Sequence, residues 1–446
     1  MAFAPLASVP APEPGAGPWP TNLQRVGGEL ILAGHRLADL AEKGTPLYLV
    51  DEKDMRGRAR AWVEAIGDGD VYYAGKSFLT PTVAAWMVEE GLCIDTASEG
   101  ELRTALAGGV PGEKIGLHGN SKSDATLRLA LESGVGRIVI DSPGEVDQVA
   151  ALAEELGVIA PCFVRVTTGV HAGGHEFIAT AHEDQKFGLS LATGAAQQVV
   201  AAIHENPHLD LLGLHSHIGS QILDSDGFSA AASAAMDFAA DLVSAGIPVA
   251  EVDLGGGYGI QYTGLDPKPA TEKEMVAGIR EAIEASCAAA GIPVPRLSIE
   301  PGRSISGPPG MTLYRVGATK DVMTDDGVRR YVSVDGGMSD NIRPALYEAD
   351  YTALLGRDSD AEPVPTRVVG MHCESGDIVI HDIALPGDVQ RGDLLLVAAT
   401  GAYGRSMASN YNMVRRPGVL AVSSRGTAWL VRPETWEDVL GLFPGN

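Results

Sequence analysis

The sequence predicts an α/β fold, a (β/α)8 TIM barrel, followed by a second and mostly antiparallel β domain. Between residues 71 and 300, eight short apolar runs each precede a break and an Ala-, Glu- and Leu-rich stretch. After residue 303, β-type runs separated by turns replace the long helical stretches. Strands that are apolar on both faces and alternate with helices form parallel sheets, and eight of them in about 230 residues fit a closed barrel.

The barrel strands are expected at the eight runs in chain order. They are Val71–Lys76, Leu92–Thr96, Lys114–His118, Arg137–Asp141, Pro161–Val166, Leu211–His217, Val249–Leu254 and Arg296–Glu300. Polar side chains gather where these runs end, among them Lys76, Asp95, His118, His217 and Glu300. The carboxyl ends of barrel strands meet at one rim, which carries the active site in such enzymes. The site is therefore predicted at that rim.

The second domain is predicted from six later runs. They are Thr312–Lys320, Arg330–Val334, Thr366–Val369, Leu394–Ala398, Val419–Ser423 and Thr427–Val431. A further strand candidate, Thr45–Val50, precedes the barrel and is expected to pair with this domain. We expect the barrel at residues 49–305, and the β domain from residues 23–48 together with 306–446.

The first 22 residues are expected to be a disordered leader. Six of the first 20 are prolines, mixed with alanine and glycine, and this composition can neither hold a helix nor bury much apolar surface. The whole chain of 446 residues exceeds the ~250–300 at which one hydrophobic core stops growing, which agrees with two domains.

Charge and cysteine content exclude several classes of protein. With 33 Lys+Arg against 58 Asp+Glu, the chain has a net charge of −25, so neither nucleic acid nor an anionic membrane is an expected partner. The 4 cysteines are spread singly without a C-x-x-C pair, which predicts no disulfide framework and no zinc site and fits a reducing cytoplasm. No apolar run approaches the ~18–20 residues of a membrane span, and no export signal precedes the barrel.

Three short motifs resemble known sites but fail on inspection. His204–His208 matches the H-E-x-x-H pattern of zinc proteases, but Pro207 breaks the helix that would bring both histidines to one face. Gly75–Ser77 resembles the end of a P-loop, but Asp70 stands where its first glycine is required. Gly255–Ile260 begins like a dinucleotide-binding motif and lacks its third glycine.

The glycines Gly255, Gly256 and Gly257 nevertheless need an explanation. They follow the seventh expected strand, where barrels often bind phosphate with exposed backbone N–H groups. For this loop alone, a tight turn is an equally good explanation. The eighth strand ends in Glu300-Pro301-Gly302-Arg303, which adds another glycine and a cation beside the loop. Together the two segments favour phosphate as the ligand.

A phosphate site gives Lys76 a possible role. A lysine in a barrel mouth that binds phosphate can form a Schiff base with pyridoxal 5′-phosphate (PLP), because burial lowers the pKa of its amine from about 10.4. Glu300 would then meet the pyridine nitrogen and keep it protonated. His215 and His217 lie two apart, which also fits a metal pair or a packed core. We favour His217 as the partner stacked on the ring, and we expect no metal.

Taken together, these residues resemble the diaminopimelate decarboxylases, a PLP-dependent family of the alanine-racemase-like barrel class. The resemblance runs from about Thr45 to Pro417, and it is the order and spacing of several blocks that make it specific. The blocks are Tyr73–Lys76, Lys186–Leu189, His217–Gln221, Gly255–Gly257, Glu300–Arg303, Cys373–Asp377 and Gly401–Tyr403. Gly75, Ser77 and Glu99 depart from the family pattern without removing a group that the chemistry uses.

The resemblance assigns roles to individual residues. It implies that Lys76 carries PLP, that His217 stacks on the ring and that Glu300 meets its nitrogen. The remaining cofactor-binding residues it implies are Asp95, Ser220, Gly255, Gly256, Gly257, Gly302, Arg303 and Tyr403. The substrate-binding residues it implies are Arg303, Arg343, Tyr347, Glu374 and Tyr403.

The resemblance further implies the reaction and the assembly. The substrate would be an amino acid, meso-2,6-diaminopimelate, decarboxylated at its D-centre to L-lysine and CO2, with Cys373 as the proton donor. In the family, the block around Cys373 serves the partner subunit's site, so a homodimer with shared active sites is expected. A PLP decarboxylase of the same fold acting on ornithine, arginine or carboxynorspermidine is the alternative. An alanine racemase and a non-catalytic PLP-binding protein fit less well.

Overall fold

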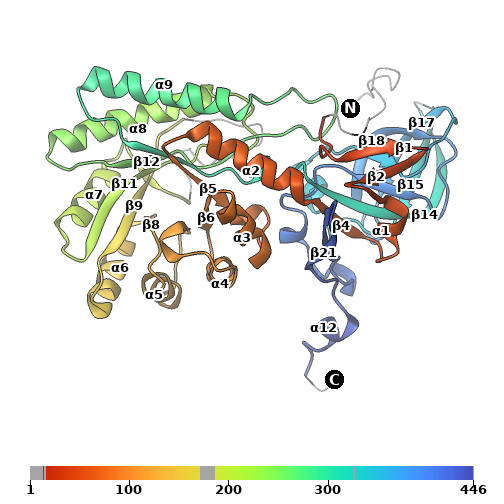
Figure 1. Cartoon of the computed structure of the whole chain (residues 1–446), viewed down its shortest axis with the longest axis horizontal. Helices are drawn as coiled ribbons and strands as arrows, with labels where there is room; N and C mark the ends of the chain where they lie inside the picture. The colour runs from red at the N-terminus through yellow and green to blue at the C-terminus, as the bar shows by residue number, and fades with distance from the viewer. Residues whose placement is uncertain (1–13, 15–16, 171–185, 326, 445–446) are drawn as a thin grey trace. The chain divides into compact units, whose positions relative to one another are not determined.

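The computed structural model describes residues 14, 17–170, 186–325 and 327–444, which form two compact units (Figure 1). The barrel unit consists of Arg58–Gly259 and Pro269–Ser304. The β unit consists of the chain up to Gly57, the segment Ile260–Lys268, and the chain from Ile305 onward. The expected division at residues 49 and 305 assigned the segment Ile260–Lys268 to the barrel.

Eight parallel strands form the closed barrel that the sequence predicts. They are β5 (Asp70–Ala74), β6 (Cys93–Thr96), β7 (Ile115–Leu117), β8 (Arg137–Ile140), β9 (Ala160–Thr167), β11 (Leu209–His215), β12 (Glu251–Asp253) and β13 (Arg296–Ile299). Each strand pairs in parallel with the next, and β13 pairs with β5 to close the ring. The short strand β10 (Leu189–Ser190) pairs with β9. Each strand overlaps one expected run, so this prediction is confirmed.

Helices alternate with the strands and lie outside them (Figure 1). They are α2 (Glu52–Ile66), α3 (Pro81–Glu89), α4 (Glu99–Ala107), α5 (Asp124–Glu132), α6 (Pro143–Leu156), α7 (Ala195–Glu205), α8 (Asp226–Ser244), α9 (Glu272–Ala290) and α10 (Arg303–Ser306). Helix α9 begins at a capping box, in which Thr271 and Glu274 satisfy each other's backbone N–H groups. Helix α7 ends at Glu205, ahead of Pro207, so His208 lies outside the helix as the sequence predicts.

The β unit contains two sheets. The smaller sheet is antiparallel and consists of β1 (Leu23–Val26), β2 (Glu29–Leu32) and β3 (His35–Arg36). The larger sheet consists of β4 (Leu47–Asp51), β14 (Gly310–Thr324), β15 (Gly327–Val334), β16 (Ala353–Leu355), β17 (Pro363–Val369), β18 (Ile378–Pro386), β19 (Leu394–Val397), β20 (Val419–Ser423) and β21 (Gly426–Val431). It is mixed, because β15 pairs with β17 and β20 pairs with β4 in parallel while the other pairings are antiparallel. Three short helices accompany it: α1 (Leu37–Ala41), α11 (Arg343–Tyr347) and α12 (Trp436–Leu440).

The sequence predicts most of this unit and misses its shorter parts. All six later runs are strands, and Thr45–Val50 contains β4, which pairs with β14 and β20 as expected. Strands β16 and β18 and the small sheet were not predicted. In β18, the polar pair His381–Asp382 interrupts the apolar run, which hid the strand. Of the expected leader, residues 1–13 and 15–16 lie outside the described residues, whereas Trp19 is 3% exposed and packs in the core of the β unit.

Both interiors are largely apolar, and both bury charged side chains. The core of the β unit is mainly Leu, Val, Ile and aromatic side chains from both sheets, and this unit also buries Asp340 and Arg343. The barrel buries comparable apolar residues together with a set of charged and titratable ones: His118, Arg137, His215, Asp253 and Glu300. Among the described residues, no helix combines the length and the apolar character that crossing a membrane requires.

Candidate active site

The residues expected at the rim of the barrel lie at or just beyond the ends of its strands. Lys76 sits in a short 3-10 turn that follows β5, and Asp95 lies on β6. His118 comes directly after β7, and Glu300 directly after β13. Lys76 is exposed, contrary to the burial expected from the sequence for its amine. The predicted gathering of these side chains at one end of the barrel is therefore present in the structure.

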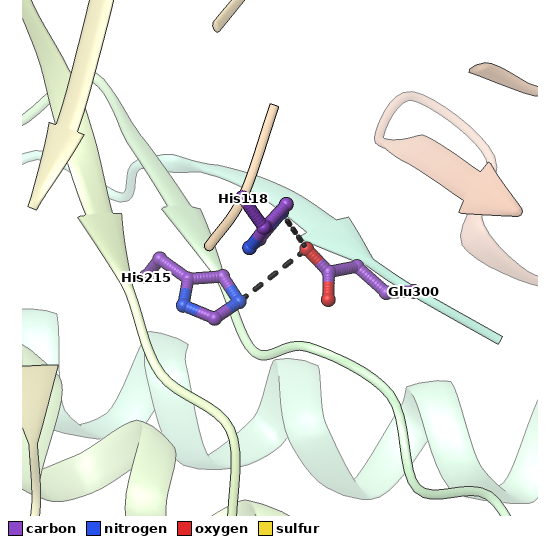
Figure 2. Close-up of side chains that lie close together, drawn as sticks. All are labelled: His118, His215 and Glu300. Atoms are coloured by element: carbon purple, nitrogen blue, oxygen red, sulfur yellow. Dashed lines mark ion pairs between the residues drawn. The ribbon is translucent and has the colours of Figure 1, made fainter. Parts of the chain in front are cut away.

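One carboxylate oxygen of Glu300 faces two imidazole rings (Figure 2). Its Oε1 atom is 2.9 Å from Nε2 of His118 and 3.3 Å from Nε2 of His215. Nε2 of His118 is also 3.3 Å from Oδ1 of Asp95. The two rings meet edge to face, with centroids 4.8 Å apart. His215 is the last residue of β11, so His217 lies beyond the strand, whereas the expected strand Leu211–His217 includes it.

The pKa values in this cluster follow from burial and mutual contact. Burial alone would raise the pKa of Glu300, but the two histidines outweigh it and hold that pKa well below its usual range. Burial lowers the pKa of His118, yet Asp95 and Glu300 together raise it overall. Burial lowers the pKa of His215 to about 4 and raises that of Asp95 to about 6. These shifts favour an ionised Glu300 and a neutral His215 at neutral pH, and the two acids favour the charged form of His118.

The same three side chains could in principle bind a metal. One ligand atom from each of His118, His215 and Glu300 lies within 4.8 Å of the others. A histidine can bind a metal only through an unprotonated nitrogen, and the raised pKa of His118 opposes that state. The carboxylate of Glu300 has one oxygen in contact with the histidines. Its second oxygen can accept a hydrogen bond from a protonated ring nitrogen of a ligand, which an ionised carboxylate suits.

The glycine loop after β12 packs against the segments that follow β11 and β13. A Cβ atom at Gly257 would collide with the carbonyl oxygen of Gly219, and one at Gly256 with that of Glu300. Gly302 is equally restricted, because a Cβ there would press on Ala74. Only glycine permits this close approach, which explains the predicted glycines by packing as well as by ligand binding.

Hydrogen bonds fix the loop and its neighbours. The N–H of Gly256 donates to Nδ1 of His217 over 3.1 Å, so this nitrogen must be the unprotonated one. Burial, and then the charges of Lys76 and Arg165, hold the pKa of His217 well below its usual value. Nη2 of Arg303 donates to Oγ of Ser220 over 2.9 Å. His217 is therefore a neutral imidazole beside the glycine loop. The hydroxyl of Ser220 and the guanidinium of Arg303, which are hydrogen-bonded to each other, lie nearby.

In the β unit, Arg343 lies among tyrosine rings. It belongs to α11, is 7% exposed, and donates from Nη1 to the hydroxyl of Tyr262 over 2.8 Å. The rings of Tyr262, Tyr347 and Tyr403 surround its guanidinium at 5.1, 5.8 and 5.9 Å. Tyr403 has a φ of 62°, a left-handed conformation that costs a residue with a side chain about 1–3 kcal/mol. No carboxylate of the described residues forms an ion pair with Arg343.

Cys373 and Glu374 lie on an exposed loop ahead of β18. The base of the loop is anchored by Asp377, whose carboxylate accepts the backbone N–H groups of Met338 and His372 at 2.6 and 2.7 Å. The ring of His372 is held in turn by Ser339, 2.8 Å away. The thiol and the carboxylate at the tip are thus presented by a fixed base and are not packed within their own unit.

Comparison with known proteins identifies the family. The family model described as "Pyridoxal-dependent decarboxylase, pyridoxal binding domain" matches residues 52–307. The diaminopimelate decarboxylase of Mycobacterium tuberculosis is 50% identical over 95% of this chain and 97% of its own, and that of Bacillus subtilis is 43% identical over the same shares. The crystal structure of the M. jannaschii diaminopimelate decarboxylase in complex with L-lysine is 31% identical, with a TM-score of 0.87 over 94% of this chain and 97% of its own. The chain belongs to the diaminopimelate decarboxylase family.

Membership of the diaminopimelate decarboxylase family makes the chain a pyridoxal-dependent decarboxylase, with PLP as its cofactor. The residues present fit this group. Glu300 offers one oxygen to a ring nitrogen, His217 is neutral as a stacking partner should be, and the glycine loop lies near Arg303 and Ser220 as a phosphate requires. Lys76 is the amine at the end of β5.

Sequence reasoning missed three residues of these clusters. His118 was recognised only as a polar strand end, and His215 was left open between a metal pair and a packed core. Both contact Glu300, and only the barrel's closure brings them together. Tyr262, the hydrogen-bond partner of Arg343, belongs to the segment Ile260–Lys268, which sequence reasoning placed in the barrel. No local pattern in the sequence marks that segment.

Proposed function

We propose that the chain removes the carboxyl group at the D-centre of meso-2,6-diaminopimelate, forming L-lysine and CO2 in the last step of lysine biosynthesis. The observation that carries this proposal is Glu300, a buried carboxylate kept ionised by two histidines beside a glycine loop and an adjacent lysine. Its relatives over nearly the whole chain are diaminopimelate decarboxylases, which supports the choice of substrate.

The barrel residues would hold the cofactor and its charges. When bound, PLP supplies an aldehyde carbon for an amino group and a ring that accepts the electron pair left by the departing carboxyl group. Lys76 supplies the protein's own amine. Glu300 would accept a hydrogen bond from the protonated ring nitrogen, and His217 would be the partner stacked on the ring. Asp95, bound to His118, completes the charge balance at this end of the barrel.

The phosphate would be held beside the glycine loop by Ser220 and Arg303, which contribute a hydroxyl and a positive charge. A guanidinium suits a dianionic phosphate, because charge-assisted hydrogen bonds are about twice as strong as neutral ones. Gly255, Gly256, Gly257 and Gly302 would let the backbone approach the phosphate closely, since none carries a side chain. The N–H groups of Gly255 and Gly256 already donate to Asp253 and His217, so these two glycines would shape the loop.

The far end of the substrate would be bound by Arg343, Tyr347, Glu374 and Tyr403, together with Arg303. At the end of the substrate that is not decarboxylated, the carboxylate needs cations, and the ammonium group needs an anion such as Glu374. Arg343 supports this assignment, because a guanidinium that is 7% exposed has only phenol partners among the described residues. A buried cation without a carboxylate is costly unless a ligand provides one. Ornithine and arginine carry a cation there, which disfavours the alternative substrates.

Cys373 would return the proton that replaces the lost carboxyl group. We further propose a homodimer in which Cys373 and Glu374 serve the partner subunit's site. Both are exposed in their own unit, as are the apolar side chains of Met371, Tyr411 and Met413. A face of this kind suits a contact with a second copy of the chain. The 4 free cysteines agree with a cytoplasmic location.

The experiment is CO2 release by PLP-loaded protein from meso-diaminopimelate, L-ornithine, L-arginine and carboxynorspermidine. We expect release from meso-diaminopimelate alone, with L-lysine as the product. Lys76→Ala should abolish both turnover and the visible absorption of bound PLP, whereas Lys53→Ala, which removes an exposed lysine of α2, should change neither. Faster release from another of the four substrates, or turnover by Lys76→Ala, would overturn the proposal.

A further inference from the structure

His118 contacts two carboxylates through one nitrogen. Its Nε2 atom lies 2.9 Å from Glu300 and 3.3 Å from Asp95, and the residues are 7%, 4% and 3% exposed. Nε2 of His215 lies 3.3 Å from the same oxygen of Glu300, Oε1 (Figure 2). Both imidazoles therefore act on one carboxylate oxygen, and Oε2 is left to accept a hydrogen bond from a ligand.

The two imidazoles differ in charge and in contact distance. His118 makes the shorter contact with Glu300, and Asp95 and Glu300 raise its pKa, whereas burial lowers the pKa of His215 to about 4. Other charged groups act on the cluster from several strands: Asp253 on β12 favours a charged His118, while Lys76 after β5 and Arg165 on β9 offset the buried acids. His118 thus makes the closer contact with Glu300 and has a second carboxylate, that of Asp95, beside the same nitrogen, which favours its charged form.

We propose that His118 is a positioning residue, which keeps Glu300 ionised and oriented so that its free oxygen faces the cofactor's ring nitrogen. This inference rests on the proposed function. A cation closer to the carboxylate than to the ring stabilises the charged pair of carboxylate and protonated nitrogen, relative to the neutral pair in which Glu300 takes the proton. His118 touches neither the cofactor nor the substrate in this role and acts only through Glu300.

Two substitutions separate the charge of His118 from its hydrogen bond. His118→Leu removes both, and His118→Gln keeps an N–H donor but loses the charge. The control His208→Leu removes a half-buried histidine of the same unit that lies beyond α7. The readouts are the Kd of the apoprotein for PLP and the 15N chemical shift of PLP labelled at the ring nitrogen. Neither readout depends on turnover.

For His118→Leu we expect a Kd about ten- to a hundredfold higher, the range for losing a hydrogen bond to a charged group. The 15N signal should move from the protonated toward the unprotonated value. His118→Gln should raise the Kd less but move the 15N signal in the same direction, and His208→Leu should match the wild type. If circular dichroism shows that His118→Leu does not fold, the 15N shift of His118→Gln decides whether His118 controls Glu300.

Two results would contradict the inference, and they differ in what they affect. Wild-type Kd and 15N shift in His118→Leu, or an unchanged 15N shift in His118→Gln, would mean that His118 does not control Glu300, while the proposed reaction would stand. Failure of the wild-type protein itself to bind PLP would instead overturn the proposed function.

Discussion

The barrel unit and the β unit hold their buried charges in different ways. In the barrel, buried acids face buried bases: Arg137 donates to Asp253 over 2.8 Å, and Glu300 contacts two histidines. In the β unit, buried charges meet tyrosine hydroxyls, as Arg343 meets Tyr262. An acid that is paired with a base of its own unit has its charge compensated there, whereas a buried cation held only by phenols lacks an anion. The contrast separates charges that support the structure from one that awaits a ligand.

The Arg137–Asp253 pair illustrates the supporting kind. The guanidinium of Arg137 lies over the rings of Tyr72 and Phe163, at 3.9 and 4.3 Å. Asp253 accepts a hydrogen bond from Arg137 with one oxygen and from the N–H of Gly255 with the other, each at 2.8 Å. The pair thereby connects the interior of the barrel to the glycine loop expected to bind phosphate.

The largest effect should follow from breaking this pair. Arg137→Leu leaves Asp253 buried without its cation, and removing one partner of a buried pair costs about 3–5 kcal/mol. Urea denaturation should detect this as a lower free energy of unfolding. As a control, Arg128→Leu removes a partly exposed arginine paired with Glu155 and should leave the free energy of unfolding close to that of the wild type. Equal stabilities of the two variants would refute the distinction drawn between buried and exposed pairs.

A smaller effect, on activity, should follow from changing the uncompensated cation. Arg343→Met should lower kcat/KM for meso-diaminopimelate about ten- to a hundredfold, because charge-assisted hydrogen bonds contribute about 1.5–3 kcal/mol. Its stability should not fall as that of Arg137→Leu does, since no described carboxylate loses a partner. Arg391→Met, at an exposed position between β18 and β19, provides the control. Steady-state kinetics with unchanged kcat/KM in Arg343→Met would remove Arg343 from the substrate site.

The sequence predicted the parts of the site that depend on local signals and missed those that depend on tertiary contacts. Strand ends are local signals, so the apolar runs predicted where Lys76, Asp95 and Glu300 come together. The glycines after β12 were equally visible, although the collisions that require them arise from three separate segments. The partners of Glu300 and Arg343 were not predictable in this way, because they depend on barrel closure and on a short segment that belongs to the other unit.

The β unit also buries an acid, Asp340, that is paired with no cation of the described residues. Testing this acid should give the smallest effect in the comparison of the two units. Asp340 accepts hydrogen bonds from the hydroxyl of Tyr314 and from the N–H of Gly337, the latter at 2.8 Å. Burial raises its pKa to about 7, although these donors oppose the shift. No described cation forms an ion pair with it. Asp340 should therefore be protonated at mildly acidic pH, where the unfolded chain has already released that proton.

The stability of the β unit should depend on pH accordingly. An acid with a raised pKa binds its proton more tightly in the folded state, so its contribution falls as pH rises from about 4 to about 7. The slope is at most about 1.4 kcal/mol per pH unit. Urea denaturation between pH 5 and 7 should give a smaller decline for Asp340→Asn than for the wild type, while Asp360→Asn, at an exposed position, should follow the wild type. If Asp340→Asn kept the wild-type slope, Asp340 would have to be ionised throughout, and the β unit would then tolerate an unpaired buried charge that the barrel does not.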